Sequence, residues 1–333
     1  MLLSTPMKKG ARFLLHKAGM LRGVRLWRRN QFRILMYHNF SSADPQARQA
    51  LDRQCAHMKR HYAVVSLTEI GRSLRGDARL PQHALAITVD DGYRDFLLNG
   101  APVFREHGLP VTVYLVSGFL DGKMWFWWDQ VAYALDASKR TTLTLALFPG
   151  KPLSTFPIET QAQRKTARVL IVEELKKMEA SDRQHFIDVE LTRGLEVDVP
   201  PHPPECAAPL LWSDVRMLQD QGVEFGAHTV THPIMSHIRN PDSLSQEIAD
   251  SKKRIEQETG RPVIHFCYPF GLSGDFNEES VTAVRKEGFL TATTAEFGMN
   301  DAQSHSMKLL RLAAEPATPF EYFTEIVAGA HAL

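Results

Sequence analysis

Short apolar segments typical of buried strands alternate with amphipathic segments typical of helices along most of this 333-residue chain. The expected strands are residues 34–38, 63–67, 84–89, 111–117, 223–228, 263–269, 289–295 and 309–314. This alternation predicts parallel strands with helices outside them, in either a barrel or a doubly wound sheet. In both architectures, side chains at the carboxyl ends of the strands form the functional site.

The alternation is interrupted between about residues 120 and 210. This stretch contains an aromatic cluster at residues 125–128, a long helical pattern near 160–188 and a proline-rich exit at 199–205. We interpret it as an insertion on the barrel rather than an independent domain. We expect the tryptophans to pack inside the insertion, and the alternative is that they form a wall on which sugar rings stack.

The N-terminal segment, residues 1–31, is basic. Residues 1–33 contain nine Lys and Arg and no Asp or Glu, which leaves 30 basic against 38 acidic residues in the remainder. An amphipathic helix on an anionic membrane surface and a basic helix packed on the protein both fit this pattern. Because the sequence contains no membrane-spanning run and no secretory signal core, we expect a cytoplasmic protein, peripheral at the inner membrane if the first alternative holds.

The three cysteines are Cys55, Cys206 and Cys267, which are far apart in sequence. Their spacing predicts neither a disulfide framework nor a thiolate zinc site. We expect small, buried or half-buried side chains at these positions.

Two adjacent carboxylates, Asp90 and Asp91, follow the expected strand at residues 84–89, and Gly92 permits a sharp turn there. Two carboxylates at the edge of a core repel each other and resist burial. Asp-Asp-Gly is also a common turn sequence, so this pair alone leaves a structural and a functional interpretation open.

A histidine pair, His228 and His232, follows another expected strand at residues 223–228. On one helical turn, residues four apart lie on the same face and both imidazoles reach one metal ion. Two histidines and one carboxylate are a common set for a divalent metal. One of the two aspartates would then bind the cation, and the other would accept a proton from water.

Two further strand ends fit this plan. Residues 267–271 (CYPFG) predict a turn in which the backbone N–H of Phe270 faces a developing oxyanion. His38 ends the first expected strand and is a candidate general acid.

The motifs TVDDG, HTVTH and YPFG, in this order, resemble the first three motifs of the NodB-type polysaccharide deacetylases, carbohydrate esterase family 4. The resemblance covers residues 32–118 and 210–315. It implies a distorted (β/α)7 barrel within residues 32–333, with the large insertion described above. It also implies a divalent metal, usually Zn2+ with Co2+, Ni2+ or Mn2+ as alternatives, and hydrolysis of N-acetyl groups on amino sugars. The resemblance further implies that Asp91, His228 and His232 are the metal ligands and that Asp90 is the general base. Phe270 and Tyr268 would contact the oxyanion and the substrate.

The sequence departs from the family pattern at three motifs. Cys267 stands where the third motif usually has an arginine that orients the base, and neither the usual fourth motif nor a C-terminal Leu-His motif is found. ILMYHNF at residues 34–40 instead resembles the permuted members that deacetylate poly-N-acetylglucosamine, whose acid histidine lies on such a strand. We therefore expect His38 to be the acid and Arg311, in LLRL, to replace the missing arginine beside Asp90.

These observations predict a metal-dependent carbohydrate N-deacetylase acting on an amino-sugar glycan or glycolipid, or on a lipid- or nucleotide-linked precursor. The alternatives are a deformylase or another amide hydrolase acting on a non-polymeric sugar, and a non-catalytic glycan-binding relative. The basic N-terminus alone does not support a nucleic-acid partner. Peripheral membrane contact through residues 1–33 is the further partner that the sequence suggests.

Overall fold

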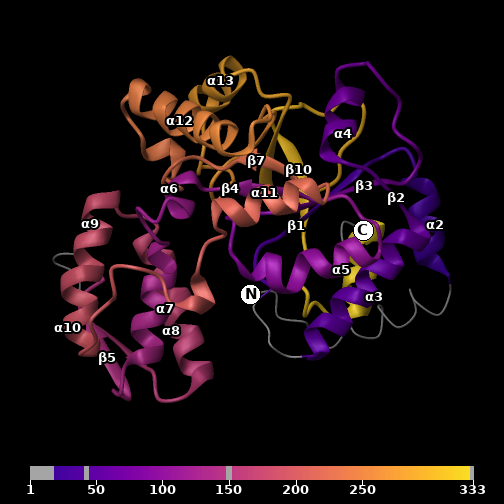
Figure 1. Ribbon diagram of the computed structural model, residues 1–333. Coiled ribbons are helices and arrows are strands. Elements are labelled where there is room, and N and C mark those ends of the chain that lie inside the picture. The colour runs from indigo at the N-terminus through magenta and orange to yellow at the C-terminus, as the bar shows by residue number, and fades with distance from the viewer. Residues whose placement is uncertain (1–18, 41–44, 148–151, 331–333) are drawn as a thin grey trace. The chain divides into compact units, whose positions relative to one another are not determined.

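The computed structural model describes residues 19–40, 45–147 and 152–330, which form two compact units (Figure 1). The first unit comprises the described parts of residues 1–120 and 209–333, and the second comprises residues 121–208.

The first unit is a closed barrel of parallel strands. Its strands are β1 (Arg33–Tyr37), β2 (Ala63–Val64), β3 (Ala84–Val89), β4 (Thr112–Leu115), β7 (Glu224–Ala227), β8 (His265–Cys267), β9 (Thr291–Phe297) and β10 (Leu309–Ala313). The sheet runs β1-β10-β9-β8-β7-β4-β3, and β3 pairs with β1 to close it, while β2 adds to the start of β3. This seven-stranded parallel barrel confirms the predicted fold class.

Helices follow most of the strands of this unit. They are α2 (Met20–Trp27), α3 (Pro45–His61), α4 (Leu67–Leu74), η1 (Phe96–Gly100), α5 (Ala101–Glu106), α6 (Ser117–Leu120), α11 (Trp212–Asp220), η4 (Met235–His237), α12 (Pro241–Thr259), α13 (Glu278–Lys286) and α14 (Phe320–Ala328). A π-helical segment, η1, directly precedes α5. The sequence marks α12 at both ends, because the Asn240 side chain caps its first turn and Gly260 ends it at φ 64°. Within the described residues, we find no helix with the length and apolarity needed to cross a bilayer.

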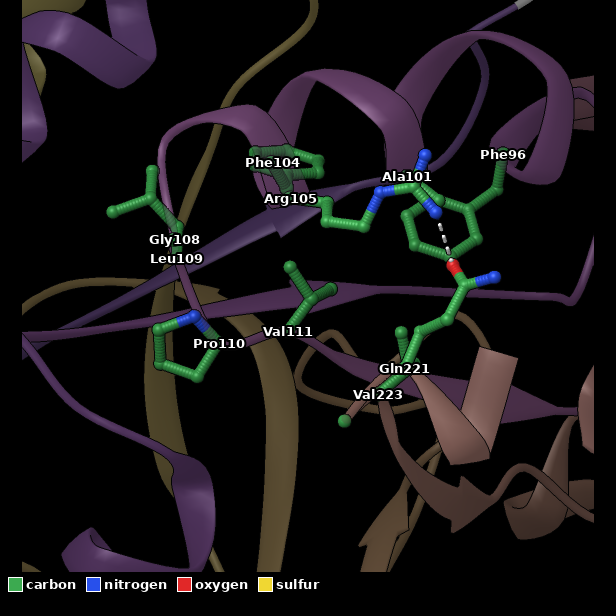
Figure 2. A pocket seen from close by; sticks show the side chains of 11 residues that line it. Phe96, Ala101, Phe104, Arg105, Gly108, Leu109, Pro110, Val111, Gln221 and Val223 are labelled. Carbon is green, nitrogen blue, oxygen red and sulfur yellow. Dashed lines mark hydrogen bonds between the residues drawn. The ribbon is translucent and has the colours of Figure 1, made fainter. Parts of the chain in front are cut away.

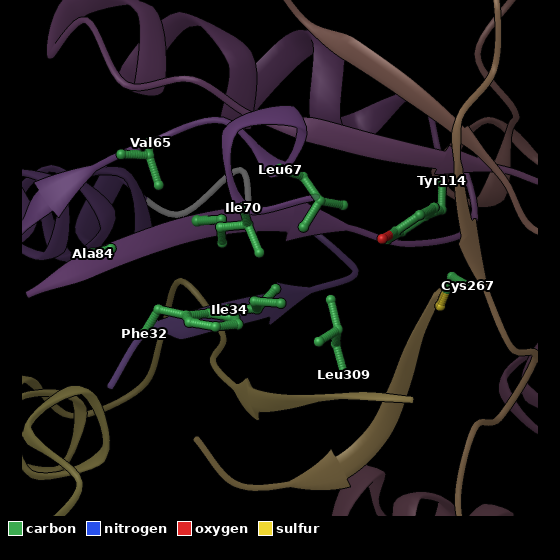
Figure 3. Close-up of a cluster of buried hydrophobic side chains, with 10 residues drawn as sticks. Phe32, Ile34, Val65, Leu67, Ile70, Ala84, Tyr114, Cys267 and Leu309 are labelled. Atoms are coloured by element: carbon green, nitrogen blue, oxygen red, sulfur yellow. The ribbon is translucent and has the colours of Figure 1, made fainter. Parts of the chain in front are cut away.

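The strands carry the barrel core. Every residue of β1 and of β3 is buried, as expected for strands covered on both faces. Part of the core is a cluster that brings Ile34 and Leu309 together with Tyr114 and Cys267 (Figure 3). Gly226 in β7 faces the Tyr114 ring so closely that a Cβ there would lie 2.5 Å from it. Packing therefore excludes a larger residue at this position.

The second unit is mostly helical. It contains α7 (Trp127–Ala137), a β5 (Thr142–Leu145) and β6 (Ser154–Pro157) hairpin, α8 (Gln161–Leu175), α9 (Ala180–His185), η2 (Phe186–Leu191), α10 (Thr192–Leu195) and η3 (Glu205–Ala207). Trp125 and Trp127 are buried, Phe126 stacks on the half-buried Trp128, and the Arg183 guanidinium lies 4.7 Å over Trp127. The aromatic cluster thus packs within this unit.

Candidate active site

The closed parallel barrel gathers polar side chains at the carboxyl ends of its strands. Asp90 and Asp91 follow β3, His228 follows β7, Cys267 ends β8 and Arg311 lies on β10. All five are buried. Because burying several charged or polar groups in one place is costly, their contacts must offset that cost.

Asp91, His228 and His232 form one cluster. The Nε2 atoms of His228 and His232 lie 3.6 Å and 3.5 Å from Asp91 Oδ1, and the three candidate ligand atoms lie within 4.8 Å of one another. Asp91 reaches the cluster because it and Gly92 adopt left-handed backbone conformations, at φ 76° and 86°. This tight turn aims the two adjacent aspartates at different partners.

The histidine pair does not lie on a helical turn, contrary to the sequence expectation. Residues 228–232 form a loop in which Thr229 and His232 have positive φ angles of 68° and 55°. The Thr229 hydroxyl donates to the His228 carbonyl and accepts the His232 N–H at 3.0 Å, which holds this conformation. The imidazole centroids lie 4.7 Å apart, so the loop brings the rings together by a different geometry.

The hydrogen bond of His228 determines which of its nitrogens can bind a metal. Its Nδ1 lies 2.7 Å from the Cys267 carbonyl oxygen, and since that oxygen only accepts, Nδ1 carries the proton. Burial lowers the pKa of His228 to about 4, so the ring is neutral near pH 7. Its Nε2 therefore turns a lone pair toward Asp91, as in metal-binding histidines held by a backbone carbonyl.

These residues fit a divalent cation. A neutral imidazole lone pair and a carboxylate oxygen repel each other at 3.6 Å, whereas a cation bound to both would attract them. Two histidines and one carboxylate suit zinc and similar metals, and they leave further coordination positions for water or substrate.

Asp90 is bound by Arg311. The Arg311 Nη1 and Nη2 atoms donate to the two carboxylate oxygens at 2.6 Å and 2.7 Å, and Nη2 also lies 3.1 Å from Cys267 Sγ. Burial alone would raise the pKa of Asp90, but the charge and hydrogen bonds of Arg311 hold it well below its usual range. The structure therefore places Arg311 beside Asp90, on the side where Cys267 presents only a small thiol.

A second group of potential ligands, formed by Asp90, His228 and Cys267, also lies within 4.8 Å. Metal binding there is disfavoured because Arg311 occupies both oxygens of Asp90. Burial also raises the pKa of the Cys267 thiol, and a protonated thiol is a poor metal ligand. Of the two groups, the cluster of Asp91, His228 and His232 is therefore the better candidate for a metal site.

Phe270 borders the cluster of Asp91, His228 and His232, whereas Tyr268 makes structural contacts. Phe270 has φ 58°, and its ring lies edge-on to His232 at 4.8 Å. The Tyr268 hydroxyl donates to the Met307 carbonyl at 3.0 Å, and its ring stacks on Phe276. The Tyr268 side chain is only 1% exposed, so we no longer expect it to contact substrate.

His38 follows β1 at the rim of this end of the barrel. Its Nε2 lies 3.7 Å from Asp90 Oδ2, and its side chain is 45% exposed. It is therefore both open to solvent and close to the buried carboxylate.

Strained backbone is concentrated at this site. Among the residues that the structure describes, six other than glycine have positive φ angles. Four of these six are Asp91, Thr229, His232 and Phe270. Such conformations persist only where the surroundings hold them, and they are typical of functional sites.

Sequence reasoning did not identify Glu247 on α12 as part of the site. Its Oε2 accepts the N–H groups of Val230 and Thr231 at 2.8 Å and 2.9 Å, and its Oε1 accepts the Thr231 hydroxyl at 2.6 Å. Glu247 therefore holds the loop between the two histidines. Glu247 lies 16 residues beyond Thr231 in the sequence, and no local sequence pattern predicts this contact.

A mostly apolar hollow of about 300 Å3 lies at the other end of the barrel (Figure 2). Its lining includes Val111 and Val223, which directly precede β4 and β7, and the Arg105–Gln221 hydrogen bond of 2.8 Å. The cluster of Asp91, His228 and His232 lies at the opposite ends of these strands, and we take that end as the candidate active site.

The fold and the site together are a closed parallel barrel with a buried carboxylate–imidazole set at the carboxyl ends of its strands. The family model described as polysaccharide deacetylase matches residues 151–292. YxkH of Bacillus subtilis (strain 168), whose name assigns it to the polysaccharide deacetylases, is 21% identical over 287 residues, which cover 85% of this chain and 71% of YxkH.

Several solved structures, some of them named as deacetylases, share the fold. Streptococcus pyogenes deacetylase PplD, solved in complex with acetate, has a TM-score of 0.58 and 17% identity, covering 89% of this chain and 98% of PplD. IcaB of Ammonifex degensii has a TM-score of 0.56 and 14% identity, covering 90% and 97%. The BpsB deacetylase domain of Bordetella bronchiseptica has a TM-score of 0.53 and 15% identity, covering 86% and 96%. This chain thus matches the polysaccharide deacetylase family model over residues 151–292 and shares the fold of these solved structures, in agreement with the resemblance of its motifs to the NodB type.

Proposed function

We propose that this protein is a metal-dependent N-deacetylase that removes the acetyl group from an amino sugar. The substrate would be a surface glycan or its lipid-linked or nucleotide-linked precursor. The observation that carries this proposal is the placement of Asp90, held by Arg311, directly beside the cluster of Asp91, His228 and His232. The match to the polysaccharide deacetylase family model over residues 151–292 and the acetate complex of PplD support the reaction class.

Asp91, His228 and His232 would hold the cation, and Zn2+ suits this set best. When bound, such a cation polarises an amide carbonyl and lowers the pKa of water. The chain contributes a neutral His228, oriented by the Cys267 carbonyl, and a His232 fixed by its loop.

Asp90 acts as the general base in this proposal. Arg311 keeps its carboxylate ionised and fixed in position, which meets the geometric requirement for accepting a proton. The same contacts make it a weak base, because they lower its pKa. Asp90 can therefore accept a proton only from a water molecule whose own pKa has been lowered.

His38 and Phe270 complete the proposed site. His38, exposed and 3.7 Å from Asp90, is placed to protonate the leaving amine, which must come from the open side. The backbone N–H of Phe270, next to His232, would help to stabilise the negative oxygen that develops on the acetyl carbon.

The precursor alternative fits a protein at the cytoplasmic face of a membrane. Nucleotide-linked and lipid-linked sugars are available there, and the basic N-terminal segment favours an anionic membrane surface. We therefore propose a cytoplasmic, membrane-peripheral location.

The function is tested by incubating the metal-loaded protein with N-acetylated amino-sugar oligosaccharides, glycolipids and nucleotide sugars. We expect release of acetate together with one free amine per acetate. Release of formate from N-formyl sugars, without acetate from their N-acetyl counterparts, would establish a deformylase instead. Release of neither acid by protein with a full metal complement would contradict the proposal.

A further inference from the structure

Helix α2 (indigo in Figure 1) exposes large apolar side chains. Met20 is 51% exposed, Leu26 is 49% exposed and Trp27 is 70% exposed. Met20 and Trp27 are seven residues apart and therefore lie within about 20° of each other around the helix. Leu21 is buried, and α2 packs against α14. Within the described part of the chain, α2 thus presents an apolar outer face, as a helix at a water–membrane boundary does.

Arginines border this face. Arg22 and Arg29 are exposed, and the Arg28 guanidinium lies 4.9 Å over the Trp27 ring. Burial and the charges of Arg25 and Arg60 lower the pKa of His61, which places the end of α3 in the same positive field. Since residues 1–33 contain no acidic residue, this surface is complementary to an anionic partner.

We propose that α2 docks the protein onto an anionic lipid membrane through Met20, Leu26 and Trp27, with Arg22 and Arg29 contacting lipid phosphates. Tryptophan favours the headgroup region of a bilayer, and nearby arginines add electrostatic attraction. The pairing of exposed apolar area with positive charge favours a membrane over a nucleic acid, for which charge alone supplies most of the affinity.

This docking leaves the candidate active site uncovered. Helix α2 leads into the amino end of β1, whereas His38 follows the carboxyl end of that strand. The Arg33 Nε–H donates to the Val327 carbonyl at the end of α14, which places the α2–α14 pair at the amino end of β1. The proposal is therefore independent of the deacetylase assignment, and its test needs no activity measurement.

The test is co-sedimentation of the full-length protein with vesicles of phosphatidylcholine alone and of phosphatidylcholine mixed with phosphatidylglycerol. We expect binding to the mixed vesicles only. Arg22→Gln and Arg29→Gln should each weaken binding about fivefold, the equivalent of roughly 1 kcal/mol per basic residue near the surface. Trp27→Ser should weaken binding without any change in charge. The matched control is Leu98→Ser, because Leu98 is 58% exposed in η1.

Two outcomes would overturn the proposal. The first is equal binding of the wild type, Trp27→Ser and Leu98→Ser proteins to the mixed vesicles. The second is tight binding to duplex DNA that is insensitive to Trp27→Ser, without vesicle binding, which would make the surface a nucleic-acid contact. Leu26→Ser serves in place of Trp27→Ser if the melting temperature of the latter shows unfolding.

Discussion

The two ends of the barrel each bury a histidine, but in different ways. At the amino end, the ring nitrogens of His265 lie 2.7 Å from the Thr291 hydroxyl and 3.0 Å from the Thr68 hydroxyl. At the carboxyl end, His228 uses Nδ1 for the Cys267 carbonyl and turns Nε2 toward Asp91. Burial lowers the pKa of both, to about 3 and about 4. Both histidines are therefore buried and neutral. They differ in the second ring nitrogen, which faces a hydroxyl in the structural His265 and a carboxylate in the candidate ligand His228.

The buried arginines show the same contrast. Arg33 at the amino end donates to the carbonyls of Val327 and Gln31, and burial lowers its pKa to about 10. Arg311 at the carboxyl end binds Asp90 through two hydrogen bonds. Burial alone would lower the pKa of Arg311, but the charge of Asp90 and these hydrogen bonds raise it above the ordinary value. One arginine ties elements together, whereas the other holds a carboxylate in place.

The largest effect that we expect is a difference in metal content between variants of His228 and His265. His228→Ala should reduce the metal content from about one ion per chain to near zero and abolish turnover, because it removes one of three protein ligands. His265→Ala should keep its metal. Metal analysis of both purified variants makes this measurement, and a full metal complement in His228→Ala would contradict the assignment.

The next effect concerns the proposed base. Asp90→Asn keeps the shape of the side chain but removes its ability to take a proton, so the rate of acetate release should fall about 100-fold or more. Its metal content should match that of the wild type. Wild-type turnover by this variant would rule out Asp90 as the base.

The two arginines should differ in their effect on stability. Arg311→Met leaves the charge of Asp90 buried without a partner and should lower the free energy of unfolding by about 3–5 kcal/mol. Arg33→Met removes hydrogen bonds to carbonyls and should cost about 1–3 kcal/mol. Denaturant titration measures both values. Adding Asp90→Leu to Arg311→Met should recover part of the loss, and strictly additive losses would argue against the pairing.

The smallest effect tests the loop between His228 and His232, the proposed metal ligands. Glu247→Ala removes the acceptor of three hydrogen bonds and should weaken metal affinity about 10- to 100-fold, as loss of a supporting contact does. Glu247→Gln should recover part of this loss. Glu256→Ala is the matched control on α12, because Glu256 accepts the Val263 N–H ahead of β8. Chelator competition measures the affinities, and equal values for Glu247→Ala and Glu256→Ala would exclude this role.

Much of the barrel could be predicted because strand periodicity is local information. Each of the eight expected strands is present, although the stretch 63–67 yields only the two residues of β2. Arg311 was expected beside Asp90 because Cys267 replaces the usual third-motif arginine and Arg311 lies on the last strand, whose carboxyl end meets those of the other parallel strands.

Local patterns could not predict the remaining features of the site. The left-handed conformations of Thr229 and His232 depend on hydrogen bonds that form only in the folded loop. The contact of Glu247 with that loop depends on how α12 packs. The Tyr268 expectation failed because adjacency in sequence does not determine which way a side chain turns.

The most direct test of the central claim is a metal titration of the metal-free wild-type protein, with acetate release measured on an N-acetylated amino-sugar oligosaccharide. Deacetylation should rise with bound Zn2+ and reach its maximum at about one ion per chain, the number that a single set of two histidines and one carboxylate can hold. Acetate release that is independent of metal content, or its absence from fully loaded protein on every amino-sugar substrate tried, would contradict the account.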